Sequence, residues 1–263
     1  MNLSYLEVDH TRSPYDALSG SEREEFHERL ALSLLYHDHA LEGVPLERDE
    51  IDRALTGKPC RNYCDGEIKK SLRRLKQAFG DVRRDARQGE ELSVEWLRAL
   101  HVHMCDEGDE AAGRYRERNT SPGVYNLKIV KSDELEGHFY QLIEDYREEY
   151  RHYHPVRAAA VTHWEFMRLF PFDERTGVVG RLMMNFLLMR ADYPPATIHA
   201  MDRHHYFKAL RGHRSDLVPV VVDGVKSTIS AAEEFASHWD EAQTSTPKPF
   251  IDRRASKPQP RAL

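Results

Sequence analysis

The residues best suited to chemistry lie in one stretch, residues 169–185, which reads LFPFDERTGVVGRLMMN. An apolar helix is expected to end at Pro171, a short acidic turn containing Gly177 follows, and a second apolar helix begins with Arg181 in its first turn. Because a helix N-terminus carries unpaired amide groups and a partial positive charge, this loop is suited to binding phosphate. Glu174 beside it could hold a divalent cation.

Composition excludes several classes of protein. The chain has 263 residues, 31% of them charged, and a formal net charge of −6, which argues against a general nucleic-acid binder. No apolar run of about 18 residues is present, and the first residues lack the layout of a signal peptide, so we expect a cytoplasmic protein without a membrane partner. Three cysteines without a CxxC pair indicate neither a disulfide framework nor a four-ligand zinc site.

Apolar residues at helical spacing dominate the remainder of the chain and predict a mainly helical fold. Ser21, with Glu24 three residues later, has the spacing of a capping box for the first long helix. An alternating run at residues 124–130, between turn signals, predicts a small β-hairpin or flap. The predicted helices are 21–36 or longer, 47–55, 67–86, 93–105, one capped by residues 132–134, 155–169, 178–189, 202–210 and 227–239.

The second helix of the opening stretch, residues 178–189, is apolar nearly all round, so it should be the central helix. The helix at 67–86 instead carries a basic face, which is either a solvated surface or a grip for a partner. Its basic residues are Lys69, Lys70, Arg73, Arg74 and Lys76.

The opening stretch resembles the active-site loop of the Fic (Fido) domain, which reads His-Pro-Phe-x-Asp/Glu-Gly-Asn-Gly-Arg-x-x-Arg. The resemblance extends over roughly residues 22–239. It implies transfer of a nucleotide monophosphate, usually AMP from ATP with Mg²⁺, onto a hydroxyl of a target protein. The segments that resemble the family outside the loop are 112–116, 158–166, 180–188, 193–198 and 203–210.

This sequence departs from the family loop at its reactive positions. Phe170 stands where the family has its histidine base, and a phenyl ring has no lone pair for a proton, a loss commonly worth about 10²–10⁴ in rate. Val178 replaces the first arginine, which would cost about 1.5–3 kcal/mol of phosphate binding unless Arg175 substitutes. Arg175 and Thr176 also replace a glycine and an asparagine of the phosphate cradle.

The resemblance leaves a short set of candidate site residues. Those for phosphate or nucleotide are Arg175, Thr176, Gly177 and Arg181, and Glu174 is the candidate for Mg²⁺ or for an alternative base. Each also has a structural reading: Glu174 as a solvated loop acid, Thr176 as the N-cap of the central helix, and Pro171 with Phe172 as a helix stop and core anchor. His163, two helical turns before Phe170, is expected to be a core histidine.

Many Fic proteins are restrained by a helix with the pattern Ser/Thr-x-x-x-Glu-Gly/Asn, and residues 38–43 resemble it, with Asp38 at the hydroxyl position. The resemblance makes Glu42 and Gly43 inhibitory residues and predicts an ion pair between Glu42 and Arg181. A metal site formed by His37 and His39 with Glu42 is disfavoured, because alternate residues of a helix face different directions.

The expected organisation is an extended lead-in at 1–20, a helical region with the inhibitory-like helix at 21–90, a Fic core at 91–240 and a disordered tail at 241–263. Three functions stay open. The first is a transferase with altered chemistry on a nucleotide or nucleotide-linked donor. The second is a catalytically silent pseudoenzyme that grips a protein partner through the flap and the basic helix. The third, DNA association through the basic face, lacks a base-reading motif.

Overall fold

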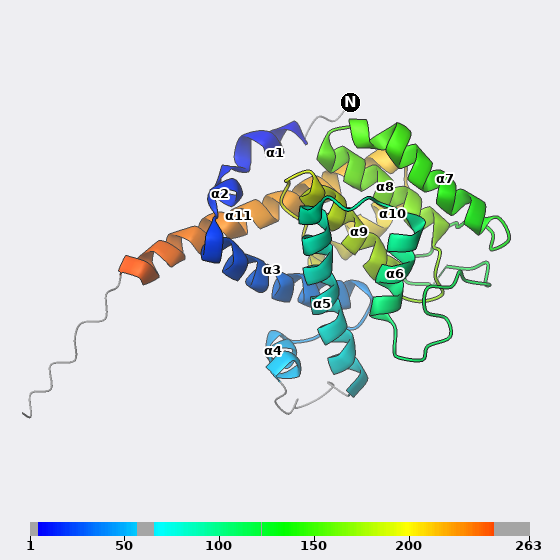
Figure 1. Cartoon of the computed structure of the whole chain (residues 1–263), viewed down its shortest axis with the longest axis horizontal. Helices are drawn as coiled ribbons and strands as arrows, with labels where there is room; N and C mark the ends of the chain where they lie inside the picture. The colour runs from blue at the N-terminus through cyan, green and yellow to red at the C-terminus, as the bar shows by residue number, and fades with distance from the viewer. Residues whose placement is uncertain (1–4, 57–65, 122, 245–263) are drawn as a thin grey trace, which may run out of the picture.

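The computed structural model is a bundle of helices packed around one central helix (Figure 1). It describes residues 5–56, 66–121 and 123–244, and no strand occurs in these ranges. The long helices are α3 (Gly20–Leu41), α5 (Gly66–Gln88), α6 (Val94–Met104), α7 (Leu135–Glu148), α8 (Pro155–Leu169), α9 (Thr176–Arg190), α10 (Arg203–Arg211) and α11 (Leu217–Thr244). The shorter helices are α1 (Leu6–Thr11), α2 (Ser13–Ala17) and α4 (Arg48–Thr56), with 3₁₀ turns at Tyr150–His152, Ala200–Asp202 and Arg214–Asp216. The all-α prediction is confirmed.

Helix α9 is the central element, as its sequence predicts. Residues 176–188 are all buried, and the helix packs against α8, α5 and α6. A helix that is apolar nearly all round is stable only when neighbours cover every face. The surrounding helices therefore fix the position of both ends of α9.

Helix α3 joins two hydrophobic clusters. Its first half contributes Phe26 and Leu30 to a small cluster with α2 and α11, and its second half contributes Leu35 and Leu41 to the main core. The helix thus extends from the outer cluster to the N-terminal end of α9, where Glu42 lies beside Gly177.

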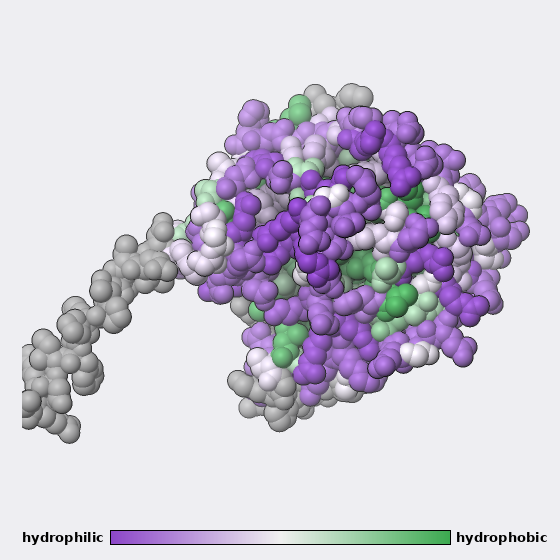
Figure 2. All heavy atoms as spheres, in the orientation of Figure 1, coloured by the Kyte–Doolittle hydropathy of each residue, from purple (hydrophilic) through white to green (hydrophobic). Residues whose placement is uncertain are grey.

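The surface in the orientation of Figure 2 is mostly hydrophilic, with small separate patches of hydrophobic residues. None of the described helices has both the length and the apolar character needed to cross a bilayer.

Two expectations about helix starts are wrong. Within the described part of the lead-in, residues 6–11 and 13–17 are helical rather than extended, because Val8 and Tyr15 are buried and Pro14 lies in the first turn of α2, where its missing amide hydrogen costs nothing. Helix α11 begins ten residues before the predicted residue 227. Gly224, which lowers helical propensity, lies where a Cβ atom would be only 3.0 Å from the carbonyl oxygen of Thr197, so close packing requires it.

The predicted β-hairpin is also wrong. Tyr125 and Leu127 are buried and Asn126 and Lys128 are exposed, so the alternation is real, but the segment is an extended loop without a partner strand in the described chain. Asn126 has a φ of 49°, which interrupts an extended run. Val130 N–H bonds the carbonyl of Arg168 on α8, where a hairpin would need a second strand.

The predicted capping box at Ser21 is absent. Helix α3 begins at Gly20 with Ser19 as the N-cap, and no side chain caps it. In the predicted tail, residues 241–244 continue α11, and residues 245–263 lie outside the described residues. Cys60 and Cys64 lie outside them too, whereas Cys105 is a buried free thiol.

Candidate functional site

The loop between α8 and α9 turns sharply at two residues in the left-handed region. Phe170 follows α8 with φ 45° and ψ 62°, and Arg175 precedes α9 with φ 60° and ψ 4°. Phe170 is only 2% exposed and its ring meets the Tyr125 ring edge-on. Non-glycine residues adopt this conformation only where packing over-determines it. Phe170 is thus a buried packing residue.

Thr176 fixes this loop from inside. Its Oγ1 accepts a hydrogen bond from Phe172 N–H at 3.0 Å and donates one to the Phe172 carbonyl at 2.9 Å. The predicted N-cap role is wrong by one position, because Arg175 is the N-cap of α9 and makes no side-chain capping bond.

Arg181 lies in the second turn of α9 and is 4% exposed. Its Nη2 pairs with Glu42 Oε1 at 2.6 Å, which confirms the predicted ion pair. Its Nε also pairs with Asp38, and its Nη1 donates to the Tyr125 hydroxyl at 3.1 Å. A buried guanidinium needs such partners, because an unpaired charge in the core is strongly destabilising.

Glu42 is positioned by the end of α3. It is the C-cap residue, and Gly43, with a φ of 91°, lets the chain turn away directly after it. The Tyr125 hydroxyl donates a second hydrogen bond to Glu42 Oε1. Burial raises the pKa of Tyr125 well above its usual value, so the hydroxyl stays protonated and acts as a donor.

Gly177 shows how closely these groups cover the start of α9. A Cβ atom on Gly177 would lie 2.5 Å from Glu42 Oε1 and closer still to the Tyr125 hydroxyl. The space above the first turn of α9, where a phosphate would sit, is therefore filled by the chain's own carboxylate and phenol.

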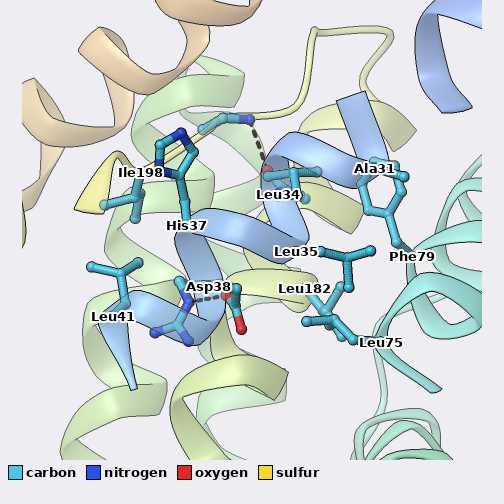
Figure 3. Close-up of a pocket in the computed structure, with 13 residues that line it drawn as sticks. Ala31, Leu34, Leu35, His37, Asp38, Leu41, Leu75, Phe79, Leu182 and Ile198 are labelled. Atoms are coloured by element: carbon cyan, nitrogen blue, oxygen red, sulfur yellow. Dashed lines mark hydrogen bonds and ion pairs between the residues drawn. The ribbon is translucent and has the colours of Figure 1, made fainter. Parts of the chain in front are cut away.

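Behind this ion pair lies an apolar cavity of about 30 Å³ between α3, α5 and α9. In Figure 3 Asp38 projects from α3 among Leu41, Leu182 and Leu75, and a dashed line marks its ion pair with Arg181. Asp38 Oδ2 is buried and has no hydrogen-bond partner among the described residues. The volume suits one or two water molecules, so it is too small for a nucleotide.

The Fic/DOC family matches residues 91–188. The chain contains a Fic domain. The protein adenylyltransferase Fic of Culex quinquefasciatus is 35% identical over 99 residues, which cover 37% of this chain and 19% of that protein. The same enzyme of Drosophila erecta is 26% identical over 233 residues, 84% of this chain and 46% of that protein. This chain therefore spans less than half the length of either relative.

Solved structures of Fic proteins share the fold. A Fic-domain signalling protein from Bacteroides thetaiotaomicron aligns with a TM-score of 0.78 at 19% identity, covering 89% of this chain and 97% of that one. IbpAFic2, in a structure described as covalently tethered to Cdc42, aligns with a TM-score of 0.51 at 18% identity, covering 86% and 68%.

Glu174 and Arg175 lie at the mouth of the Fic-domain loop. Glu174 is exposed and Arg175 is half-buried, and neither side chain has a hydrogen bond or ion pair within the described parts of the chain. Neighbouring Asp173 instead pairs with Arg118 at 3.2 Å. No group of three or more histidine, cysteine or acidic residues in the described ranges could hold a metal, so a metal at Glu174 would need further ligands from bound phosphates.

Two histidines near this Fic-domain site have structural roles. His163 is fully buried, and its Nε2 pairs with the Tyr206 hydroxyl at 2.8 Å, so the predicted core position is confirmed. Burial lowers the pKa of His163 to about 3. His37 accepts a hydrogen bond from Ala200 N–H and packs on the ring of His199, away from Glu42.

Sequence reasoning included Arg116 in a segment that resembles the family but assigned it no role; it is 2% exposed and holds the end of α8. Its Nε donates to the Phe170 carbonyl at 2.7 Å and its Nη2 to the Leu169 carbonyl at 3.0 Å. Other bonds reach the carbonyls of Arg118 and Val130. Arg116 thereby satisfies carbonyls that the helix end leaves unpaired.

Proposed function

We propose that this Fic-domain protein does not transfer AMP by the usual route and works as a catalytically silent, protein-binding module whose nucleotide site is held closed. The observation that carries the proposal is the position of Glu42 and Tyr125 over Gly177 in the first turn of α9. Phe170, buried at the position where the family has its base, supports the same conclusion.

Two carboxylates, rather than one, hold Arg181 in this chain. Arg181 pairs with Asp38 as well as Glu42, so a γ-phosphate would have to displace two carboxylates. Breaking one buried ion pair costs about 3–5 kcal/mol, which lowers nucleotide affinity by about 10²–10³-fold or more. Asp38 lies four residues before Glu42, on the same face of α3, which explains how both reach one guanidinium.

Thermal unfolding with ATP and Mg²⁺ tests the closed site. At millimolar nucleotide we expect no rise in Tm for the native chain, because the cradle is occupied. In Asp38→Ala/Glu42→Ala we expect a lower Tm, since Arg181 loses both of its carboxylate partners. The control Glu25→Gln changes an exposed pair with Arg29 and should leave Tm nearly unchanged. A clear rise in the native chain would contradict a closed site.

The second candidate function is a transferase with altered chemistry on a nucleotide-linked donor. Exposed Glu174 and half-buried Arg175, which have no partner within the described ranges, favour it, because they could offer a metal ligand or base and a phosphate contact at the loop mouth. Self-labelling of the native chain by a nucleotide-linked donor, lost in Glu174→Gln, would favour this candidate. Recovery of self-labelling with ATP in Phe170→His/Val178→Arg, with Asp38 and Glu42 also replaced by alanine, would show that only the loop and its closure have diverged, whereas continued absence of label would implicate the rest of the pocket.

A protein is the partner class that we propose, in line with the Cdc42 adduct of IbpAFic2. The basic face of α5 is a weaker docking candidate, because Lys70, Arg74 and Lys76 pair with Glu67, Asp106 and Glu28. The loop at residues 123–130 presents exposed Lys128 beside the closed site. A photo-crosslinking amino acid at Lys128 should capture a partner protein, whereas capture only from a site on α7 would place the interface elsewhere.

A further inference from the structure

A polar cavity of about 70 Å³ lies at the ends of α3 and α9 that are far from Arg181. Its lining residues are Tyr15 of α2, Arg23 and His27 of α3, Arg83 and Arg87 of α5, and Met189, Asp192 and Tyr193 at and after the end of α9. His27 and Asp38 are eleven residues apart on α3, or about 16 Å at 1.5 Å per residue. The cavity is therefore separate from the Fic-domain loop.

The charge of this cavity is positive. Arg23, Arg83 and Arg87 supply three guanidinium groups. Glu24 pairs with two of them, at 2.6 Å from Arg83 and 2.9 Å from Arg87, and Asp192 at the exposed rim is the acidic lining residue. The three guanidinium groups and these two carboxylates together carry a net charge of +1.

Several buried nitrogen atoms around the cavity lack a partner among the described residues. His27 is 3% exposed, and its Nε2 pairs with the Tyr15 hydroxyl at 3.2 Å, but its Nδ1 has no partner in the described chain. Arg23 Nε and Arg83 Nη1 are likewise buried without a partner there. Buried polar atoms in folded proteins are nearly always hydrogen-bonded, so three unpartnered nitrogen atoms on residues that line one cavity point to an acceptor beside them.

The protonation state of His27 fits an anion. Burial, followed by the charges of Arg83, Arg87 and Arg23, lowers the pKa of His27 to about 3, so the ring is neutral at ordinary pH. Either Tyr15 or Nε2 can donate in their hydrogen bond, and in the tautomer in which the Tyr15 hydroxyl donates, Nδ1 carries the hydrogen and is a donor.

We propose that this cavity is a binding site for a tetrahedral oxyanion of phosphate size, held by Arg23, Arg83, Arg87 and His27. A cavity of about 10–15 Å³ holds one water molecule, so this volume admits an oxyanion in place of several waters. Arginine forks bind phosphate oxygens in pairs, and the enclosing helices exclude much of the solvent that would screen them. The anion is free phosphate or the phosphate group of a larger molecule, which share this chemistry.

Titration calorimetry on the full chain tests the site. Inorganic phosphate, at ionic strength kept constant with sodium chloride, should bind saturably. Arg83→Gln and Arg87→Gln should each weaken binding at least about tenfold, because each removes a charged hydrogen bond. Arg84→Gln is the matched control: it removes the same charge one position along α5, where Arg84 is 57% exposed and pairs with Asp81. Its phosphate affinity should equal that of the native chain.

Phosphoserine in place of phosphate distinguishes the sources. Tight binding of phosphoserine with weak binding of phosphate supports a phosphate group of a larger molecule, and the reverse supports the free ion. Either ligand should shift the NMR signals of the His27 ring. Arg87 is 51% exposed, so Arg87→Gln should fold even if Arg83→Gln does not. The proposal would be overturned if phosphate bound no more tightly than chloride, or if Arg84→Gln weakened phosphate binding as much as Arg83→Gln and Arg87→Gln.

Discussion

Gly177 is the residue at which close approach matters most in this fold. Tyr125 and Glu42 lie where its side chain would be, so alanine must displace both and weaken their bonds to Arg181. We expect Gly177→Ala to lower the free energy of unfolding by about 1–3 kcal/mol, the usual cost of overpacking.

The control for this change is Gly80→Ala on α5. Gly80 lies inside a helix, and no neighbouring atom comes within 4 Å of the position that a Cβ would take, so alanine should raise stability by about 0.5–1 kcal/mol. Urea denaturation measures both variants. Equal effects of the two changes would mean that the contact above Gly177 is loose.

Because His163 is buried, we expect the free energy of unfolding to depend on pH. Its pKa is about 3 in the fold and about 6.5 when unfolded, so below about pH 6.5 the unfolded chain binds a proton that the folded chain does not. The contribution of the neutral His163 ring to the free energy of unfolding is complete above about pH 6.5. It is lost at about 1.4 kcal/mol per pH unit as the pH falls towards 3.

His163→Gln removes this contribution, while its amide can still pair with Tyr206. Between pH 6 and 4 the slope of unfolding free energy against pH should fall by about 1.4 kcal/mol per unit relative to the native chain. The same change at exposed His138 should preserve the native slope. An unchanged slope in His163→Gln would show that the ring is protonated in the fold.

For single residues, the sequence predicted one side-chain partner of Arg181 and missed two. The Glu42–Arg181 pair followed from a resemblance between two short patterns, and the structure confirms it. Asp38 and Tyr125 were missed as partners of Arg181, because they come from segments 143 and 56 residues away and no local periodicity encodes such a contact. The four-residue spacing of Asp38 and Glu42 was the available signal.

Among the elements, the loop residues 113–121 and 123–131 are joined to the end of α8 largely through Arg116. Arg116→Gln removes the charged fork that joins the loop to the end of α8 and leaves buried carbonyls unpaired. We expect a loss of about 3 kcal/mol or more and faster amide exchange at Val130. Arg116→Lys should rescue little, because an ammonium cannot reproduce the planar fork.

The neighbouring variant Arg114→Gln provides the control, since Arg114 is exposed. Arg114→Gln should change the free energy of unfolding by less than about 0.5 kcal/mol and should leave the rate of amide exchange at Val130 as in the native chain. A small effect of Arg116→Gln, similar to that of Arg114→Gln, would mean that solvent satisfies these carbonyls.

Periodicity predicted the long helices because each buries an apolar face, as α5 does with Leu72, Leu75 and Phe79. It failed for the loop around Tyr125. There the side chains alternate between buried and exposed because one side of the loop packs on the core, although no second strand pairs with it in the described chain. It failed again at the start of α11, which was predicted at residue 227, whereas the structure extends the helix back to Leu217, with Pro219 in its first turn and Gly224 in a tight contact.

Across the whole molecule, α3 spans from an outer hydrophobic cluster to the closed site. The outer cluster consists of Tyr15, Leu18, Phe26, Leu30, Ala232 and Phe235, from α2, α3 and α11. Asp38 and Glu42, at the other end of α3, are held instead by Arg181 in the main core. The two ends of one helix are thus secured by different sets of contacts.

This arrangement predicts that the outer cluster opens separately. Phe26→Ala should cost about 3–5 kcal/mol as a cavity forms. Amide exchange should accelerate in residues 13–30 and 229–239, whereas residues 156–188 keep protection close to the native level, because opening of the small cluster leaves the Arg181 contacts in place. Phe186→Ala in α9 is the comparison and should accelerate exchange in both regions, since Phe186 is fully buried in the main core. If Phe26→Ala accelerated exchange equally in α8 and α9, the clusters would form one cooperative unit, and the closed site would depend on the outer cluster as well as on its own ion pairs.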